Sequence, residues 1–175
     1  PQAPLRNGKA LAFALEQVNG LADLEGVVAA LDRSQAMIEF AADGTIVLAN
    51  TNFLGAMGYR LEEIAGRHHR MFMPAGESES AAYTQFWADL RAGRFQTAEF
   101  KRVGKGGREI WIQATYTPVL DPSGRVTKVV KFATDVTAAK LKNADYEGQL
   151  TAINKSQAVI EFDLSGKILR ANDLF

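Results

Sequence analysis

Residues 100–137 read FKRVGKGGREIWIQATYTPVLDPSGRVTKVVKFATDVT, and this stretch decides the fold. Two turns divide it. The first is the glycine-rich run at 104–107, and the second is Asp-Pro-Ser-Gly at 121–124, where Pro and Gly occupy the second and fourth places of a type I turn. Periodicity and these turn residues predict three strands, at residues 95–102, 109–120 and 126–135.

The residues before this stretch carry both helix and strand signals. The sequence predicts a helix over 9–33, interrupted at Asn19–Gly20, and then a hairpin with strands at 36–40 and 45–49 around an Asp-Gly turn. Helical segments are predicted next, at residues 50–58, 61–65 and 81–91. Strands, then helices, then three strands predict an α+β domain with an antiparallel sheet and a pocket between its two layers.

An internal repeat organises the chain. Residues 34–50 read SQAMIEFAADGTIVLAN and residues 156–172 read SQAVIEFDLSGKILRAN, an offset of 122 residues. At this offset, 15 of the 31 positions from Asp23 to Phe53 are identical to their counterparts. The predicted organisation is a helical segment at 1–33, a domain at 34–137, a linker helix at 138–155 and the start of a truncated second repeat at 156–175. We expect the parent protein to continue into a complete second domain.

Composition excludes several classes of function. The chain has 175 residues, 47% of them apolar, no net charge and no cysteine. Disulfides, thiolate zinc sites, iron–sulfur clusters and cysteine nucleophiles are therefore excluded. No net basic field is available for nucleic acid, and no apolar stretch is long enough to span a membrane, so we expect a cytoplasmic location. Phosphate-binding loops, nucleophile elbows and Ser-His-Asp arrangements are missing as well, which predicts a protein that is not an enzyme.

Residues 34–137 resemble a PAS sensory domain. The similarity is carried by IEFAADGTIVLAN at 38–50, by NFLGAMGYRLEEIAGRHHRMF at 52–72 and by the three-strand stretch. The closing Asp135-Val136-Thr137 is similar to the D-I/V-T signature at which PAS domains join an output helix. The resemblance implies a five-stranded antiparallel sheet with short helices over one face and flanking helices at both ends.

The repeated SQAxIEF phrase and GRHHRMF most resemble the tandem-PAS sensors of methyl-accepting chemotaxis receptors. That resemblance implies a sensory module that detects a small ligand or a cofactor state and relays it through its C-terminal helix. Asp135 and Thr137 would form the relay and cap this helix. The implied partner is a chemotaxis signalling domain in the same longer chain. The apolar positions of helix 9–33 separately predict a parallel or antiparallel homodimer in which this helix takes part. The alternative is a ligand-free PAS dimerisation module of a histidine kinase or cyclic-dinucleotide enzyme.

Two cofactors follow from the resemblance. Haem b comes first, because some chemotaxis PAS domains bind it through a histidine where this chain has His68 and His69. The strand at 126–135 lacks the tryptophan of those domains, and the alternative is that both histidines are turn residues, one of them packing or capping. Flavin comes second, since the chain lacks the cysteine of LOV-type domains, and Gln96 and Arg102 replace the tryptophan and asparagine of Aer-type domains.

The resemblance also places the remaining side chains on the two faces of the sheet. Trp111 alternates with Ile110 and Ile112 and would contact the N-terminal helix on the outer face, with exposure to a partner as the alternative. Arg102 is predicted to lie on the solvated surface with the other scattered basic residues. On the inner face, the residues expected to line a ligand pocket are Phe53, Met57, Phe86, Leu90, Ile112, Ala114 and Tyr116.

Overall fold

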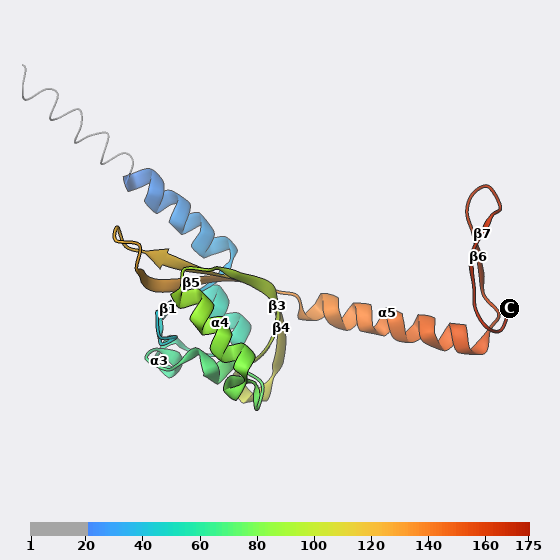
Figure 1. Ribbon diagram of the computed structural model, residues 1–175, viewed down its shortest axis with the longest axis horizontal. Helices are drawn as coiled ribbons and strands as arrows, with labels where there is room; N and C mark the ends of the chain where they lie inside the picture. Colours follow the sequence, from blue (N-terminus) through green and yellow to red (C-terminus); the bar gives the residue numbers. More distant parts are fainter. Residues whose placement is uncertain (1–20) are drawn as a thin grey trace, which may run out of the picture. The chain divides into compact units, whose positions relative to one another are not determined.

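The computed structural model describes residues 21–175. The chain divides into two units, of which the first ends at Asp135 and the second runs from Val136 to Phe175. The first unit is built on a five-stranded antiparallel sheet in the order β2-β1-β5-β4-β3 (Figure 1), which confirms the predicted α+β fold. The strands are β1 (Ala36–Ala41), β2 (Ile46–Ala49), β3 (Gln96–Val103), β4 (Glu109–Leu120) and β5 (Val126–Asp135).

Short helices cover one face of this sheet (Figure 1). They are α2 (Thr51–Met57), α3 (Leu61–Ile64), the 3₁₀ segments η1 (His69–Phe72) and η2 (Glu77–Glu79), and α4 (Ala81–Arg91). A further 3₁₀ turn, η3 (Lys105–Gly107), joins β3 to β4. The side chains that point from β1, β4 and β5 toward the helices form the core with the buried faces of α2, α3 and α4.

The turn between β1 and β2 requires a glycine. Gly44 has a φ of 92°, which favours glycine strongly. A Cβ at this position would also lie 2.7 Å from the Nε2 of His68 and 3.0 Å from the ring of Trp87. The tight turn therefore lets the segment that carries the histidine pair approach the backbone of the hairpin.

Asn50 connects four parts of the first unit. Its side-chain oxygen accepts hydrogen bonds from the backbone N–H groups of Phe53 and Met37, both at 2.9 Å, which caps α2 and fixes β1. Its amide nitrogen donates to the carbonyls of Asp32 and Gln35, both at 2.8 Å. One side chain thus holds the end of the preceding helix against the start of α2.

The helix α4 buries the face that its sequence predicts. Tyr83, Trp87 and Leu90 are buried, and Phe86 packs against the core at the same helical spacing. Ser80 caps the helix by accepting a hydrogen bond from the backbone N–H of Tyr83 at 3.1 Å. The helix therefore lies on the sheet with an aromatic face toward β3 and β4 (Figure 1).

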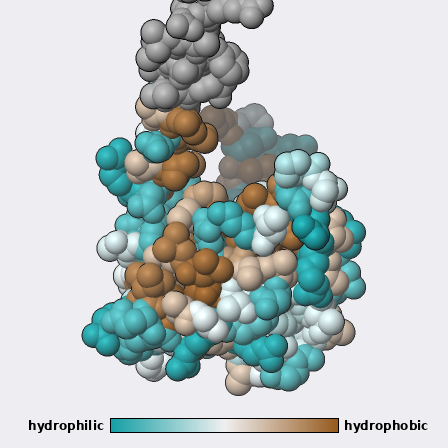
Figure 2. Space-filling view, turned by 90° about the vertical axis from the view of Figure 1, so that its left-hand side faces the viewer, coloured by the Kyte–Doolittle hydropathy of each residue, from teal (hydrophilic) through white to brown (hydrophobic). Residues whose placement is uncertain are grey.

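The N-terminal helix was expected to cover the outer face of the sheet, and that expectation is wrong for its described part. Residues 21–34 are helical and all of them are exposed. Figure 2 shows apolar surface on the turns that follow the grey segment. Trp111 is half-buried on the face opposite to Ile110 and Ile112, as alternation along β4 predicts. The rest of the predicted helix, with its break at Asn19–Gly20, lies outside the described residues.

The second unit contains α5 (Thr137–Ser156) and a hairpin of β6 (Ile160–Phe162) and β7 (Ile168–Ala171). Ile160 pairs with Ala171 as Ile38 pairs with Ala49. Both hairpins have a register shift after the corresponding glutamates, Glu39 and Glu161. The two hairpins therefore share one register at the offset of 122 residues found in the sequence. That residues 156–175 form the start of a second repeat stays a prediction, which this shared register supports.

Candidate functional site

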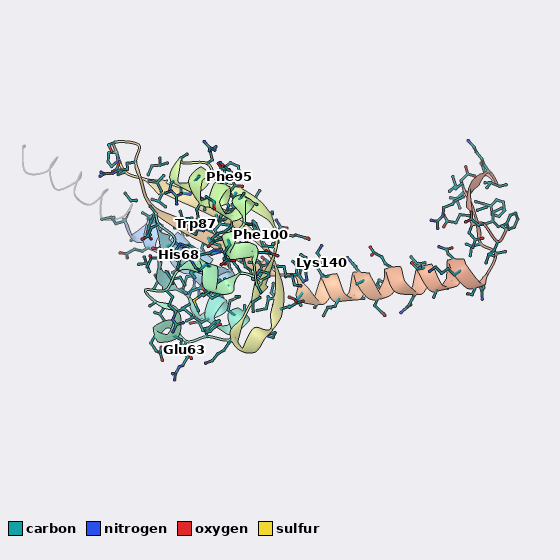
Figure 3. All side chains as sticks on the ribbon, turned by 60° about the horizontal axis from the view of Figure 1, so that its bottom comes forward. Glu63, His68, Trp87, Phe95, Phe100 and Lys140 are labelled. Atoms are coloured by element: carbon teal, nitrogen blue, oxygen red, sulfur yellow. The ribbon has the colours of Figure 1, made fainter. Side chains whose placement is uncertain are left out.

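The histidine pair lies where a loop segment runs beside the β1–β2 hairpin. Thr45 and His68 form a β-bridge, and the backbone N–H of His69 donates to the carbonyl of Gly44 at 2.9 Å. His68 has extended backbone and His69 begins the 3₁₀ segment η1, so their side chains leave the chain in different directions. His68 consequently faces the hairpin turn and the ring of Trp87 (Figure 3), at a ring-to-ring distance of 5.8 Å, whereas His69 enters the core.

Both ring nitrogens of each histidine are occupied by protein groups. In His68, Nε2 bonds to the carbonyl of Asp43 at 2.8 Å, and Nδ1 accepts from the backbone N–H of Arg70 at 3.1 Å. In His69, Nδ1 bonds to the hydroxyl of Tyr83 at 2.9 Å and Nε2 to that of Tyr116 at 3.0 Å.

An axial haem ligand needs a free imidazole nitrogen directed at open space. Neither histidine offers one, because each ring nitrogen already has a hydrogen-bond partner in the protein. His69 is also enclosed by aromatic rings, with the ring of Phe40 centred 5.3 Å away and that of Trp87 5.5 Å away. The residues present therefore do not fit haem, and the assignment of His68 or His69 as its ligand is not supported.

Two cations are buried beside His69. Lys131 on β5 and Arg102 on β3 are only 1% and 4% exposed, and both point toward the helical layer. The Nζ of Lys131 lies 4.9 Å from the ring centre of Tyr116 and 5.3 Å from that of Phe53, and the guanidinium of Arg102 lies 4.6 Å from that of Phe100. Aromatic faces thus stabilise both positive charges. The expectation that Arg102 lies on the solvated surface is wrong.

Burial and positive charge together set the protonation of this cluster. Burial lowers the pKa of His69 well below its usual value, and Arg102 and Lys131 act in the same direction. Burial also lowers the pKa of Lys131. Burial alone would raise the pKa of Tyr116, but the charges of Lys131 and Arg102 outweigh it and hold that pKa below its usual value. The imidazole of His69 is therefore neutral at neutral pH.

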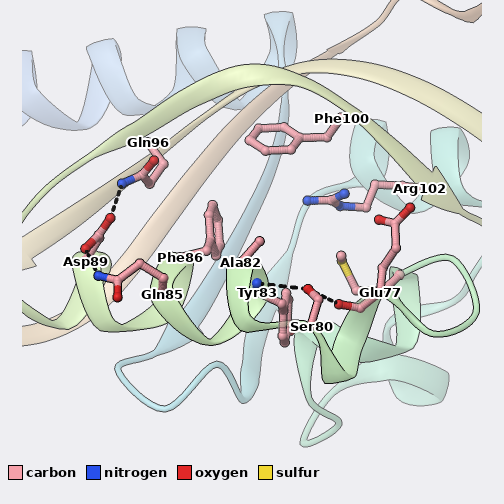
Figure 4. Close-up of a pocket in the computed structure, with 11 residues that line it drawn as sticks. Glu77, Ser80, Ala82, Tyr83, Gln85, Phe86, Asp89, Gln96, Phe100 and Arg102 are labelled. Atoms are coloured by element: carbon pink, nitrogen blue, oxygen red, sulfur yellow. Dashed lines mark hydrogen bonds between the residues drawn. The ribbon is translucent and has the colours of Figure 1, made fainter.

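A cleft of about 590 Å³ opens between α4 and β3 (Figure 4). Its middle is aromatic, with Phe86 on the helix and Phe100 on the strand. At one end Asp89 accepts hydrogen bonds from the side chains of Gln85 and Gln96 at 2.6 and 3.2 Å. The other residues that line the cleft are Met73, Glu77, Ser80, Ala82, Tyr83 and Arg102. Its volume lies within the range of about 300–1,000 Å³ that small-molecule sites occupy.

The predicted pocket lining forms the packed core instead, apart from one residue that lines the cleft. Phe53, Met57, Leu90, Ile112, Ala114 and Tyr116 are at most 2% exposed. The ring of Tyr116 meets those of Phe86 and Phe100 at 4.9 and 5.5 Å, so side chains occupy this part of the interior. Of the seven residues predicted to line the pocket, Phe86 is the one that lines the cleft. The sequence predicts a ligand pocket between the inner face of the sheet and the helices α2 and α4, whereas the structure opens a cleft between α4 and β3.

Asp135 and Thr137 lie at the junction that the sequence predicts. Asp135 ends β5 and Thr137 begins α5. The residue at the N-cap position is Val136, and no side-chain hydrogen bond caps the helix there. That Asp135 or Thr137 accepts hydrogen bonds from the first backbone N–H groups of α5, and that the two residues form the relay, stays a prediction.

Sequence reasoning missed the buried cations, although a signal for them was present. Lys131 stands midway between Val129 and Ala133, and the alternation of β5 places all three on the inner face. Arg102 follows Phe100 by two residues on β3 and shares its face. Alternation along a strand therefore outweighs the usual tendency of a charged side chain to stay in solvent.

Comparison with known proteins identifies the family. The sequence pattern of the PAS fold matches residues 31–141. The biofilm dispersion protein BdlA of Pseudomonas aeruginosa is 45% identical over 148 residues, which are 85% of this chain and 36% of BdlA. The chain thus spans about a third of that relative's length. In the described residues 21–175, no helix combines the length and apolarity that crossing a membrane requires.

Solved structures agree on the fold. A light-oxygen-voltage domain studied with a flavin analogue is 26% identical, with a TM-score of 0.55 over 70% of this chain and 96% of that chain. A PAS domain from Colwellia psychrerythraea is 20% identical, with a TM-score of 0.58 over 66% of this chain and 98% of that chain. The five-stranded sheet, the helices over one face and the match to residues 31–141 together show that the chain belongs to the PAS family.

Proposed function

We propose that this chain is a sensory PAS module of a chemotaxis-linked signalling protein. It binds a small ligand in the cleft between α4 and β3 and relays occupancy through β5, Asp135 and Thr137 into α5. The observation that carries the proposal is the cleft itself, which combines aromatic walls with the buried guanidinium of Arg102. The 45% identity to BdlA supports the signalling context.

The route from the cleft to β5 consists of contacts between named side chains. Arg102 at the cleft donates to the hydroxyl of Tyr116 on β4 at 3.4 Å. Lys131 on β5 packs over the ring of Tyr116, and β5 ends at Asp135 immediately before α5. A ligand that moves Arg102 therefore acts on the strand that leads to the C-terminal helix.

Two measurements test this proposal. A library of small molecules is screened by thermal unfolding of the purified chain, because a ligand that binds only the folded state raises the melting temperature. Output of the full-length parent is then compared between wild type and Asp135→Ala. The proposal expects Asp135→Ala to leave ligand binding unchanged and to reduce the response to ligand. An unchanged response from a folded variant would contradict it.

Flavin is the cofactor that the similar light-oxygen-voltage structure favours. This chain has no cysteine, so it cannot form a cysteinyl adduct with a flavin. In addition, the core rings of Phe40, His69 and Tyr116 lie within 6.3 Å of one another and leave no space for a flavin ring among them. The residues therefore do not fit the light-oxygen-voltage chemistry. An absorption spectrum of the purified protein tests both this statement and the exclusion of haem.

The exposed N-terminal helix favours a second function, dimerisation. Leu21, Leu24, Val28 and Leu31 follow the alternating spacing of a coiled-coil seam. Their side chains are between 38% and 60% exposed. We propose that a second copy of the chain packs along this seam in a homodimer. Light scattering tests it, with a dimer expected for wild type and a monomer for Val28→Glu, and a monomeric wild type would refute it.

A further inference from the structure

The cleft between α4 and β3 is lined by a buried cation, Arg102. We infer that this cleft binds a small monocarboxylate, with the carboxylate paired to Arg102 and an apolar body lying on Phe86 and Phe100. The inference rests on the proposed sensory function and names its ligand class. In the described part of the chain, the ion pairs formed include neither Arg102 nor Lys131.

The hydrogen bonds of Arg102 leave donors available. One terminal nitrogen donates to the carbonyl of Lys101 at 2.7 Å, and the other donates to the hydroxyl of Tyr116 at 3.4 Å. The Nε of Arg102 is buried and has no hydrogen-bond partner. A guanidinium carries five N–H donors in a planar fork that matches the two oxygens of a carboxylate. The incomplete bonding of Arg102 therefore points to an acceptor that enters from the cleft.

The position of the guanidinium is fixed before a ligand arrives. Its central carbon lies 4.6 Å from the ring centre of Phe100, which holds the plane of the fork beside the cleft (Figure 4). A buried charge without a counter-ion costs free energy, and an entering carboxylate offsets that cost. A ligand with a negative charge therefore gains more at this site than a neutral analogue of the same shape.

The remaining lining selects the body of the ligand. Phe86, Phe100, Met73 and the methyl group of Ala82 supply apolar contacts in the middle of the cleft. Two carboxylates, Glu77 and Asp89, also line the cleft and repel negative charge. Arg102 offsets this repulsion for one carboxylate of a ligand, and a second carboxylate has no such partner in the lining. The site therefore fits an aromatic or branched monocarboxylate better than a dicarboxylate.

The test uses isothermal titration of the whole chain with three matched compounds. The probes are 3-phenylpropionate, its amide, and phenylsuccinate, which adds a second carboxylate. The variants are Arg102→Gln, which removes the charge, and Ala82→Trp, which fills the cleft from an exposed helix position. Arg125→Gln is the matched control, because its side chain is 81% exposed in the β4–β5 turn.

Wild type is expected to bind 3-phenylpropionate about ten- to a hundredfold more tightly than the amide, as a charge-assisted pair implies. Arg102→Gln should abolish that preference. Ala82→Trp should weaken the binding of both compounds, and Arg125→Gln should leave both affinities unchanged. Phenylsuccinate should bind more weakly than 3-phenylpropionate. If Arg102→Gln does not fold, the inference is tested by two other results: the ratio of the wild-type affinities for the acid and the amide, and the loss of affinity in Ala82→Trp.

The inference is overturned if acid and amide bind equally, if folded Arg102→Gln retains the preference, or if phenylpropionate shows no Kd below about 1 mM. In each of these cases a neutral ligand found in the thermal screen would leave the sensory proposal standing. The sensory proposal fails separately, if the output of the full-length parent does not depend on this module.

Discussion

Acidification is expected to destabilise the protein through His69. This ring is 0% exposed, both of its nitrogens bond to tyrosine hydroxyls, and Arg102 and Lys131 place positive charge beside it. Burial therefore lowers its pKa well below the usual value of 6.5. In the unfolded chain His69 takes up a proton near pH 6.5, whereas in the folded protein it does so only at lower pH.

The sign and size of the effect follow from proton linkage. Between the two pKa values the unfolded state binds more protons, so the free energy of unfolding falls as the pH is lowered. One such group changes that free energy by at most about 1.4 kcal/mol per pH unit, or about 2 kcal/mol between pH 6.5 and 5. His68 adds to the fall, because burial lowers its pKa too. Carboxylates with lowered pKa values, such as Asp121, stabilise the folded state throughout this range. Their contribution is lost only when the pH falls below about 4.

The assay is urea unfolding of the whole chain at a series of pH values between about 7.5 and 5. His69→Gln is expected to be less stable than wild type at neutral pH, and its stability should depend less on pH by up to about 1.4 kcal/mol per unit. His68→Gln is the comparison: it leaves the buried ring in place and should lose only the smaller part of the pH dependence that the lowered pKa of His68 itself contributes. Equal pH dependence in wild type and folded His69→Gln would refute the argument. If the variant does not fold, the pKa of His69 is followed by NMR in wild type. A ring that titrates near its usual pKa would also refute the argument.

Three further substitutions, and a fourth as a control, test the packing around the site, each by the change in the free energy of urea unfolding. Tyr116→Phe removes a hydroxyl that bonds to two buried side chains and should cost about 1–3 kcal/mol; a cost below about 0.5 kcal/mol would mean that the cluster is not coupled. Gly44→Ala places a methyl group 2.7 Å from a ring nitrogen at a positive φ, and should cost more than about 1 kcal/mol. Asn50→Ala removes four hydrogen bonds and should cost about 2–4 kcal/mol. Asn172→Ala, at the equivalent position of the second hairpin, should leave the transition of the first unit unchanged.

The backbone was predictable where one residue sets local geometry. Asn50 before α2, Ser80 before α4 and the Asp-Pro-Ser-Gly turn at 121–124 each act within a few residues of their position. The limits of α4, β4 and β5 consequently agree with the sequence prediction.

The site was not predictable in the same way, because its contacts join distant parts of the chain. His69 bonds to hydroxyls that lie 14 and 47 residues further along, and only the topology of the sheet brings them together. Charged residues are rarely buried, so the sequence pattern predicts a solvated position for Arg102 and gives no prediction for Lys131. The position of the cleft depends on how α4 lies against β3, which local patterns do not encode.

The four hydrogen bonds of Asn50 have a mechanical consequence. Residues 21–34 form a rod about 21 Å long, because a helix rises about 1.5 Å per residue. Its base is tied by the carbonyls of Asp32 and Gln35 to the same amide that caps α2. A tilt of α2 by about 10° carried through this joint would displace the far end of the rod by about 4 Å. A small rotation in the layer over the core thus becomes, at the tip of the rod, a movement as large as a side chain.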